Sequence, residues 1–301
     1  MSVRLALSTA WAGGDLNRVL EILPHVDSLE IGSKGNRDFF TDLDILIRDE
    51  RIPVTSIHAV AHPGKQVGEA YYAPQLASLD EQVRMRELEE ISATAEWALD
   101  IGTQALVIHT GRIEDDELRS MCLEFRDGVW NGKDERYRQE LFQEIIHRRA
   151  GQSRPYLESI MDGLDLLCSR FPDLSFFIET RVHYYEIPLP DELETIFNAL
   201  PYPNLGYWND IGHTQMLDIL GFVPMRTWQE RFSARCGGTH IHDMDAELLD
   251  HYPPGEGVLD IHNILEQFDA DVLLTLEINA RHDYESVIRG IRYLRADRIC
   301  V

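Results

Sequence analysis

The sequence predicts an α/β fold, an eight-stranded (β/α)₈ barrel, and three observations lead to this prediction. Eight short apolar runs alternate with longer, charge-rich amphipathic segments along the whole chain. The runs are continuous and rich in β-branched and aromatic residues, which is typical of parallel strands buried on both faces. The length of 301 residues fits one barrel of about 250 residues with insertions. We therefore expect a single domain over residues 1–301.

The expected strands are spread along the chain, with helical segments between them. They cover residues 3–10, 28–32, 54–60, 105–111, 174–181, 205–210, 237–243 and 272–279. A doubly wound sheet would also alternate, but it usually has fewer strands and a glycine-rich first turn. The sequence contains neither a Gly-x-Gly-x-x-Gly turn nor a phosphate-binding P-loop. The barrel is the better interpretation.

Amphipathic segments between the strands predict helices. Residues 15–26 begin with Asp15, which can cap a helix. Residues 78–102 have apolar residues near a spacing of 3.6 and end at Gly102, a suitable C-terminal cap. Residues 261–269 and 284–298 show the same pattern.

The longest gap between expected strands covers residues 112–173. A barrel crossover needs only one helix, so we expect an extended helical insertion after strand 4, over approximately residues 112–155. An insertion at the carboxyl end of a strand lies over the active site of such a barrel. It could cover the substrate or form a contact between subunits.

Composition favours a cytoplasmic protein that acts on small molecules. The formal charge is −24, and such a surface repels phosphate backbones, so nucleic acid is disfavoured as a partner. No apolar run reaches the roughly 18 residues of a membrane span, and the N-terminal apolar stretch is interpreted as a strand. The cysteines are far apart and form no Cys-x-x-Cys pair, which favours a reducing compartment. They are Cys122, Cys168, Cys236 and Cys300.

The expected strands tend to end in a single ionisable residue. In a barrel of parallel strands the carboxyl ends converge on one face, and catalytic groups come from those ends. Seven such coincidences are improbable by chance, although each one alone is weak. The residues are Glu30, His58, His109, Glu179, Asp210, His240 and Glu277.

The last four of these residues predict a divalent metal site. Glu179, Asp210, His240 and Glu277 end four consecutive strands. Three carboxylates in a buried mouth would repel one another unless a cation neutralised them. One histidine with three carboxylates suits Mn²⁺, Co²⁺ or Mg²⁺, and Zn²⁺ is also compatible.

Several motifs resemble the xylose-isomerase-like TIM-barrel superfamily. That group includes sugar isomerases and epimerases, inosose dehydratases and endonuclease IV. The resemblance covers the whole barrel apart from the insertion. It implies that Glu179, Asp210, His240 and Glu277 bind the metal and that His213 approaches the substrate or a second metal. The motifs are IET at Glu179, Asp210-Ile-Gly-His213, THIHDMD at 239–245, HYPPGEG at 251–257 and LEIN around Glu277.

In the sugar epimerases that the chain resembles, the metal holds two adjacent oxygens of a ketose. This acidifies the intervening C–H bond by stabilising the enediolate. Two glutamates, matching Glu179 and Glu277, then remove and return the proton. The resemblance therefore implies a metal-dependent isomerase or epimerase of a small sugar, polyol or hydroxy-carbonyl compound. A dehydratase of the inosose type is an alternative.

Additional histidines support a second hypothesis, a zinc-dependent phosphodiester hydrolase. His58, His109, His213 and His251 lie where endonuclease IV has ligands for two further zinc ions, so more than one ion could bind. One expected ligand departs from that pattern, because Asp250 is displaced by one residue from the Asp-x-His spacing. The same histidines could instead bind substrate. A third hypothesis is a non-catalytic barrel that binds a ligand and keeps only a vestigial active site.

The remaining candidates surround this site. We expect Glu30 to have a structural or substrate-orienting role, Arg281 to bind an anionic group of the substrate, and Asp243 to orient a ligand histidine. His242 is expected to point away from His240. Three basic residues that follow strands 2 and 3 could meet a phosphate or carboxylate on the substrate, namely Lys34, Arg37 and Lys65. The resembled family also suggests a homodimer or homotetramer.

Overall fold

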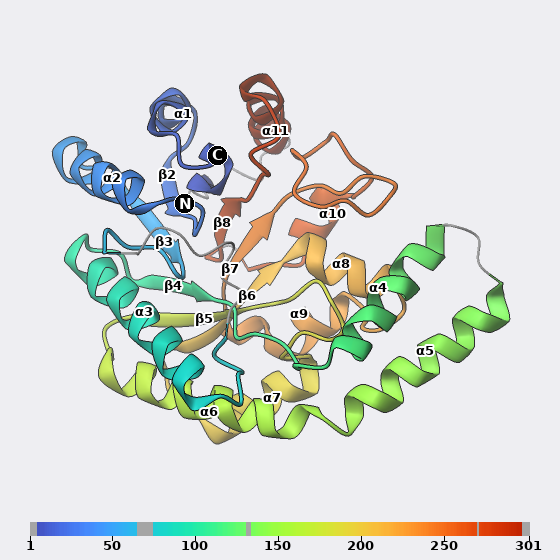
Figure 1. Cartoon of the computed structure of the whole chain (residues 1–301). Helices are drawn as coiled ribbons and strands as arrows, with labels where there is room; N and C mark the ends of the chain where they lie inside the picture. Colours follow the sequence, from blue (N-terminus) through green and yellow to red (C-terminus); the bar gives the residue numbers. More distant parts are fainter. Residues whose placement is uncertain (1–4, 65–74, 131–133, 270, 297–301) are drawn as a thin grey trace.

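The protein forms a closed barrel of eight parallel strands in chain order, as the computed structural model shows (Figure 1). The structure describes residues 5–64, 75–130, 134–269 and 271–296. β1 pairs with both β2 and β8, which closes the sheet. The strands are β1 Leu5–Ser8, β2 Ser28–Ile31, β3 Val54–His58, β4 Ala105–Ile108, β5 Ser175–Glu179, β6 Leu205–Asp210, β7 Cys236–Ile241 and β8 Leu273–Leu276. The predicted fold class is confirmed.

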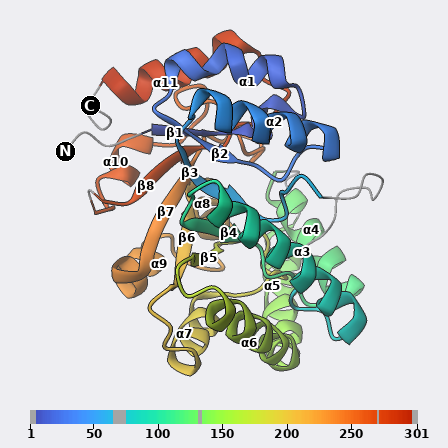
Figure 2. The same cartoon turned by 90° about the vertical axis from the view of Figure 1, so that its left-hand side faces the viewer.

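Helices surround the barrel on its outside, as Figures 1 and 2 show. The α-helices are α1 Leu16–Ile22, α2 Arg37–Glu50, α3 Glu81–Asp100, α4 Asp116–Trp130, α5 Glu135–Ala150, α6 Ser153–Arg170, α7 Pro190–Ala199, α8 Ile211–Ile219, α9 Arg226–Phe232, α10 Ile261–Leu265 and α11 Tyr284–Ala296. Short 3₁₀ turns cover Thr9–Ala12, Leu23–His25 and Ser233–Arg235.

Local signals account for several helix ends. The Asp15 carboxylate accepts a hydrogen bond from the Asn17 N–H and caps α1, as expected. The helix expected over 15–26 stops at Ile22 and continues as a 3₁₀ turn that contains Pro24. Proline has no N–H to continue the helical ladder. Asp80 caps α3 through the Gln82 and Val83 N–H groups, so this helix begins at Glu81, within the expected range of 78–102.

The segment between β4 and β5 contains α4 and α5 in addition to the crossover helix α6. α4 and α5 form a helical hairpin that extends beside the barrel (Figure 1). A buried side chain, Arg149 of α5, ties the hairpin to the loop after β5. Its guanidinium donates to both carboxylate oxygens of Glu192, at 2.7 and 2.8 Å, and to the carbonyl oxygens of Tyr184 and Glu186. The hairpin is thereby fixed to a loop at the carboxyl end of the barrel.

Among the described residues, no helix combines the length and the apolar character that crossing a bilayer requires.

Candidate metal centre

The four predicted ligands lie together at the carboxyl ends of β5 to β8. Glu179 and Asp210 end their strands, His240 is the penultimate residue of β7, and Glu277 directly follows β8. Nδ1 of His240 lies 2.7 Å from Oε1 of Glu179, 3.8 Å from Oδ2 of Asp210 and 3.2 Å from Oε2 of Glu277. One ligand atom from each residue lies within 4.8 Å of the other three.

The orientation of Asp210 fits a bound cation. Its Oδ1 accepts from the His213 N–H at 2.8 Å and caps α8. Its Oδ2 is buried and has no hydrogen-bond partner among the described residues. A buried carboxylate oxygen without a partner is costly, and a divalent cation would satisfy it. The carboxylate-rich donor set therefore fits a divalent metal ion.

Glu30 supports the other side of the His240 ring. Nε2 of His240 lies 3.1 Å from both carboxylate oxygens of Glu30. Glu30 is fully buried, and its Oε2 also accepts from Oγ of Ser56 at 2.8 Å. A carboxylate behind a ligand histidine fixes the tautomer and leaves the opposite nitrogen free to bind metal. Glu30 thus occupies the position that we expected Asp243 to fill.

The Asp243 side chain instead organises the loop that contains Pro253 and Pro254. Its carboxylate accepts backbone N–H bonds from Gly255, Gly257 and Leu259, each at 3.0 Å. A Cβ on Gly257 would clash with this carboxylate, so a glycine is required there. The expectation for Asp243 is corrected: β7 ends at Ile241, and the Asp243 side chain turns to loop amides rather than to a histidine ring.

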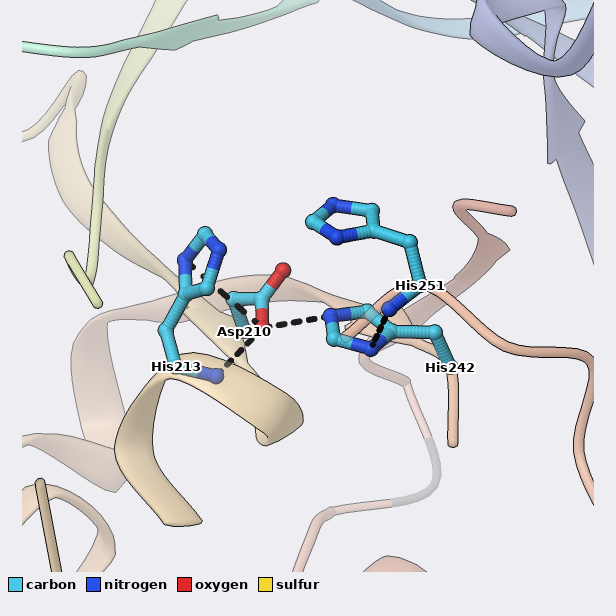
Figure 3. A group of neighbouring side chains, drawn as sticks. All are labelled: Asp210, His213, His242 and His251. Carbon is cyan, nitrogen blue, oxygen red and sulfur yellow. Dashed lines mark hydrogen bonds and ion pairs between the residues drawn. The ribbon is translucent and has the colours of Figure 1, made fainter. Parts of the chain in front are cut away.

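A second cluster adjoins the first through Asp210. Figure 3 shows the side chains of Asp210, His213, His242 and His251 close together. One ligand atom from each of these residues lies within 4.8 Å of the others. Nε2 of His242 lies 2.9 Å from Oδ1 of Asp210, and Nδ1 of His213 lies 3.7 Å from the same oxygen. A Cβ on Gly212 would overlap the His242 ring, so this close approach depends on a glycine.

The prediction that His242 points away from His240 is wrong, because His242 contacts Asp210 in the second cluster. Residues two apart in an extended segment point to the same side, so His240 and His242 both face the mouth. The spacing of two residues between His240 and His242 could therefore have predicted that both side chains lie on the same side of the strand.

His251 links the second cluster to Glu277. Its ring stacks on His242 with centroids 4.2 Å apart, and its Nε2 lies 3.5 Å from Oε2 of Glu277. Its Nδ1 lies 3.0 Å from Oδ1 of Asp250, whose other oxygen is 4.0 Å from Nε2 of His213. The displaced Asp250 therefore still reaches both histidines. His251 has a φ of +60°, a left-handed conformation that is uncommon for residues other than glycine.

A third group of side chains surrounds Oε2 of Glu179, the carboxylate oxygen that does not contact His240 at 2.7 Å. Nε2 of His58 lies 3.6 Å from Oε2 of Glu179, and Nε2 of His109 contacts the same oxygen. Arg181 donates to this oxygen at 2.7 Å and also pairs with Glu186. Arg181 was not predicted, although it follows Glu179 by two residues and the same spacing rule could have found it.

The histidines keep the carboxylates ionised. Burial alone would raise the pKa of Glu179, but His109, His240 and His58 hold it well below the usual value. Burial would likewise raise the pKa of Glu277, and His240 and His251 lower it well below the usual value. Anionic carboxylates are the form that binds a metal ion.

The imidazoles divide into two kinds. Burial would lower the pKa of His240, but Glu30 and Glu277 raise it well above the usual value. Burial and the neighbouring Arg181 lower the pKa of His109 to about 3. The two rings differ in the direction of their pKa shift because carboxylates surround His240 and a guanidinium adjoins His109.

The clusters open into a cavity of about 440 Å³. Its lining contains Lys34 and three arginines in addition to histidines and glutamates of the clusters. Arg281 is not among the described lining residues; it donates to the Asp250 carbonyl oxygen and lies over the Tyr252 ring. Lys65 lies outside the described residues. The principal lining side chains are His58, His109, Arg112, Arg119, Glu179, Arg181, His213, His251 and Glu277.

The chain belongs to the xylose isomerase-like TIM barrel family, which matches residues 27–297. No curated protein matches the chain by sequence. Among solved structures, a D-tagatose 3-epimerase-like protein is similar at a TM-score of 0.65 and 16% identity, covering 98% of this chain and 96% of its own. The 3-keto-D-glucoside 4-epimerase YcjR from E. coli has a TM-score of 0.65 at 15% identity, with 98% and 99% covered. The IolI protein with a bound zinc atom has a TM-score of 0.65 at 14% identity, with 99% and 98% covered.

Proposed function

We propose that the protein is a divalent-metal-dependent isomerase or epimerase of a small sugar or related hydroxy-carbonyl compound. The observation that carries this proposal is the placement of Glu179 and Glu277 beside the same nitrogen of His240, at the base of a cavity of sugar size. The family and the epimerases among the similar structures support it. Glu179, Asp210, His240 and Glu277 would hold the ion.

When bound, the ion would polarise a carbonyl and a neighbouring hydroxyl of the substrate and make the C–H bond beside them more acidic. Glu179 and Glu277 are the groups proposed to remove and return that proton. Their pKa values are lowered, so each carboxylate is ionised at neutral pH and has an oxygen that can take up a proton. Arg181 and His109 hold Oε2 of Glu179, while His251 lies beside Oε2 of Glu277. Each glutamate is thus oriented by its own partners.

The test is hydrogen exchange at carbon. Purified protein with Mn²⁺ is incubated in D₂O with a panel of ketoses and inososes, and deuterium incorporation is followed by NMR and mass spectrometry. We expect exchange and epimer formation with at least one compound, and loss of both in Glu277→Gln with metal still bound. Full turnover by that variant would exclude the two-glutamate mechanism. A product lighter by one water would instead identify the dehydratase alternative.

A specific observation favours a second candidate, a zinc-dependent phosphodiester hydrolase. The described residues contain three overlapping groups of metal-binding type, and two of them include histidines beyond the first site. Imidazole-rich groups favour Zn²⁺, and a site with several zinc ions can activate water. The charge of −24 opposes a nucleic-acid substrate.

Two measurements separate the candidates. Metal analysis of the native protein would give one equivalent of Mn²⁺, Co²⁺ or Mg²⁺ for the sugar enzyme and two or three of Zn²⁺ for the hydrolase. Incision of abasic-site DNA by the zinc-loaded protein would support the hydrolase, and absence of cleavage with a full zinc complement would exclude it. If the purified protein contains no metal and its melting temperature does not change with Mn²⁺ or Zn²⁺, the hypothesis of a non-catalytic ligand-binding barrel would be favoured.

A further inference from the structure

Two arginines from the start of the insertion line the cavity. Arg112 follows β4 by four residues and is half-buried, and Arg119 lies in the first turns of α4 and is exposed. Both belong to the cavity lining together with the metal-centre residues. The insertion therefore contributes positive charge to the same cavity whose base is rich in carboxylates.

Backbone pairing builds this part of the wall. The segment around Arg112 is joined to the loop after β5 by an antiparallel bridge between Arg112 and Glu186. The Ile113 N–H donates to the Tyr185 carbonyl at 3.0 Å, and the Ile187 N–H donates to the Gly111 carbonyl at 3.1 Å. The Arg119 side chain lies against Tyr185, which also lines the cavity. The two arginines are thus placed on a wall made by two connected loops.

The charges in the cavity are unevenly matched. Arg181 pairs with Glu179 and Glu186. Arg112 and Arg119 form no ion pair with a carboxylate within the described part of the chain, although the protein has 52 acidic and only 28 basic residues. In so acidic a protein, two cations in one cavity without carboxylate partners attract an anionic ligand. Guanidinium groups match the geometry of phosphate and carboxylate oxygens.

We propose that the substrate carries an anionic group, a phosphate or a carboxylate, and that Arg112 and Arg119 bind it. The proposal rests on the proposed function, because it assigns the substrate class of the same cavity. The reacting end of the substrate faces the metal centre, and the anionic end faces the wall formed by the insertion. The insertion thereby determines which members of the sugar class bind.

Binding measurements test this without requiring turnover. Titration calorimetry of the Mn²⁺-loaded protein compares D-fructose, D-fructose 6-phosphate and D-fructuronate. We expect at least one anionic probe to bind more tightly than fructose. Arg112→Ala and Arg119→Ala should each weaken that probe about tenfold, with fructose unchanged. Arg119→Lys should retain part of the affinity for a phosphate, because lysine supplies the charge without the bidentate geometry.

Arg136→Ala is the matched control. Arg136 lies on α5 of the same hairpin in an exposed pair with Glu140, so its loss should change no affinity. Preference for fructose 6-phosphate identifies a phosphate, and preference for fructuronate identifies a carboxylate. The inference is wrong if neither anion binds more tightly than fructose, or if the preference survives in the double alanine variant. If the preference is present but no carbon-bound proton exchanges, the proposed function fails and the anion site stands.

Discussion

At the scale of single residues, the two nitrogens of His240 have different tasks. Nδ1 faces the carboxylates of Glu179, Asp210 and Glu277, and Nε2 faces Glu30. The carboxylate of Glu30 holds the ring so that Nδ1 points to the cluster. Metal affinity should therefore depend on a residue that does not bind the ion.

We predict that Glu30→Gln weakens Mn²⁺ binding by about 10- to 100-fold, because the amide holds the imidazole less strongly and makes it a poorer ligand. Titration calorimetry would measure the change. Glu90→Gln is a suitable control, since Glu90 forms a similar pair with His62 at 2.8 Å but is absent from the metal-binding groups. Equal Mn²⁺ affinities of the wild type and Glu30→Gln would show that Glu30 does not contribute to metal binding.

At the scale of elements, the hairpin of α4 and α5 is held by a few charged side chains. Arg149 is nearly fully buried and pairs with Glu192 and two carbonyl oxygens. By contrast, Arg154 of α6 forms an exposed pair with Glu158. The first contact should stabilise the protein and the second should contribute little.

Replacing Arg149 with methionine should lower the free energy of unfolding by about 3–5 kcal/mol, because Glu192 is left buried without its partner. Arg154→Ala should cost less than about 1 kcal/mol. Urea unfolding followed by circular dichroism would measure both. A loss for Arg149→Met no larger than that for Arg154→Ala would show that the hairpin is held by other contacts.

Asp115 gives the hairpin a defined pH dependence. Its carboxylate accepts from Arg148 at 2.6 Å and from Gln152 at 2.6 Å, and it caps α4 through the Leu118 N–H. The Arg148 hydrogen bond is the largest cause that holds the pKa of Asp115 far below its usual value. A group whose pKa is lowered by folding stabilises the protein above its unfolded pKa, and this contribution is lost as the pH falls toward the folded pKa.

We therefore predict that Asp115→Asn destabilises the protein at pH 7 and that the difference from the wild type shrinks below about pH 4, the unfolded pKa of an aspartate. Urea unfolding of both proteins at several pH values between neutral and acid would measure it. Asp127→Asn is a control, because Asp127 has an exposed neighbouring pair with Arg126. A difference that stays constant with pH would contradict the assignment.

At the scale of the whole molecule, the barrel brings residues from distant parts of the chain together in one candidate metal centre. Glu30 and Glu277 are separated by most of the sequence, yet both contact His240. The residues that would bind the ion come from four strands that must be closed into the sheet before the site exists. Metal binding should therefore stabilise the folded barrel as a unit.

Saturating Mn²⁺ should raise the free energy of unfolding by about 2.7 kcal/mol when its concentration is 100 times the dissociation constant. EDTA should reverse the rise in melting temperature, and Asp210→Asn should largely abolish it. Differential scanning calorimetry would measure these changes, with Mg²⁺ and Zn²⁺ in parallel. An unchanged melting temperature with every ion would argue against a metal site.

The sequence by itself determined the strand order and four of the groups at the mouth of the barrel. Parallel strands leave a strong local pattern of continuous apolar residues, and the ionisable residue that ends each run has its position set by the strand. Glu179, Asp210, His240 and Glu277 could be grouped because their strands are consecutive in chain and in space.

Only the tertiary structure decided which partner each of those groups has. Glu30 rather than Asp243 lies behind His240, because closure of the barrel brings side chains of β2 and β7 into contact, while the Asp243 carboxylate accepts from loop amides. The contacts of Arg149, Arg112 and Arg119 depend on how the insertion returns to the loop after β5, and no local pattern specifies that path. The local sequence pattern determines where each strand ends, whereas closure of the barrel and packing of the loops determine which side chains contact one another.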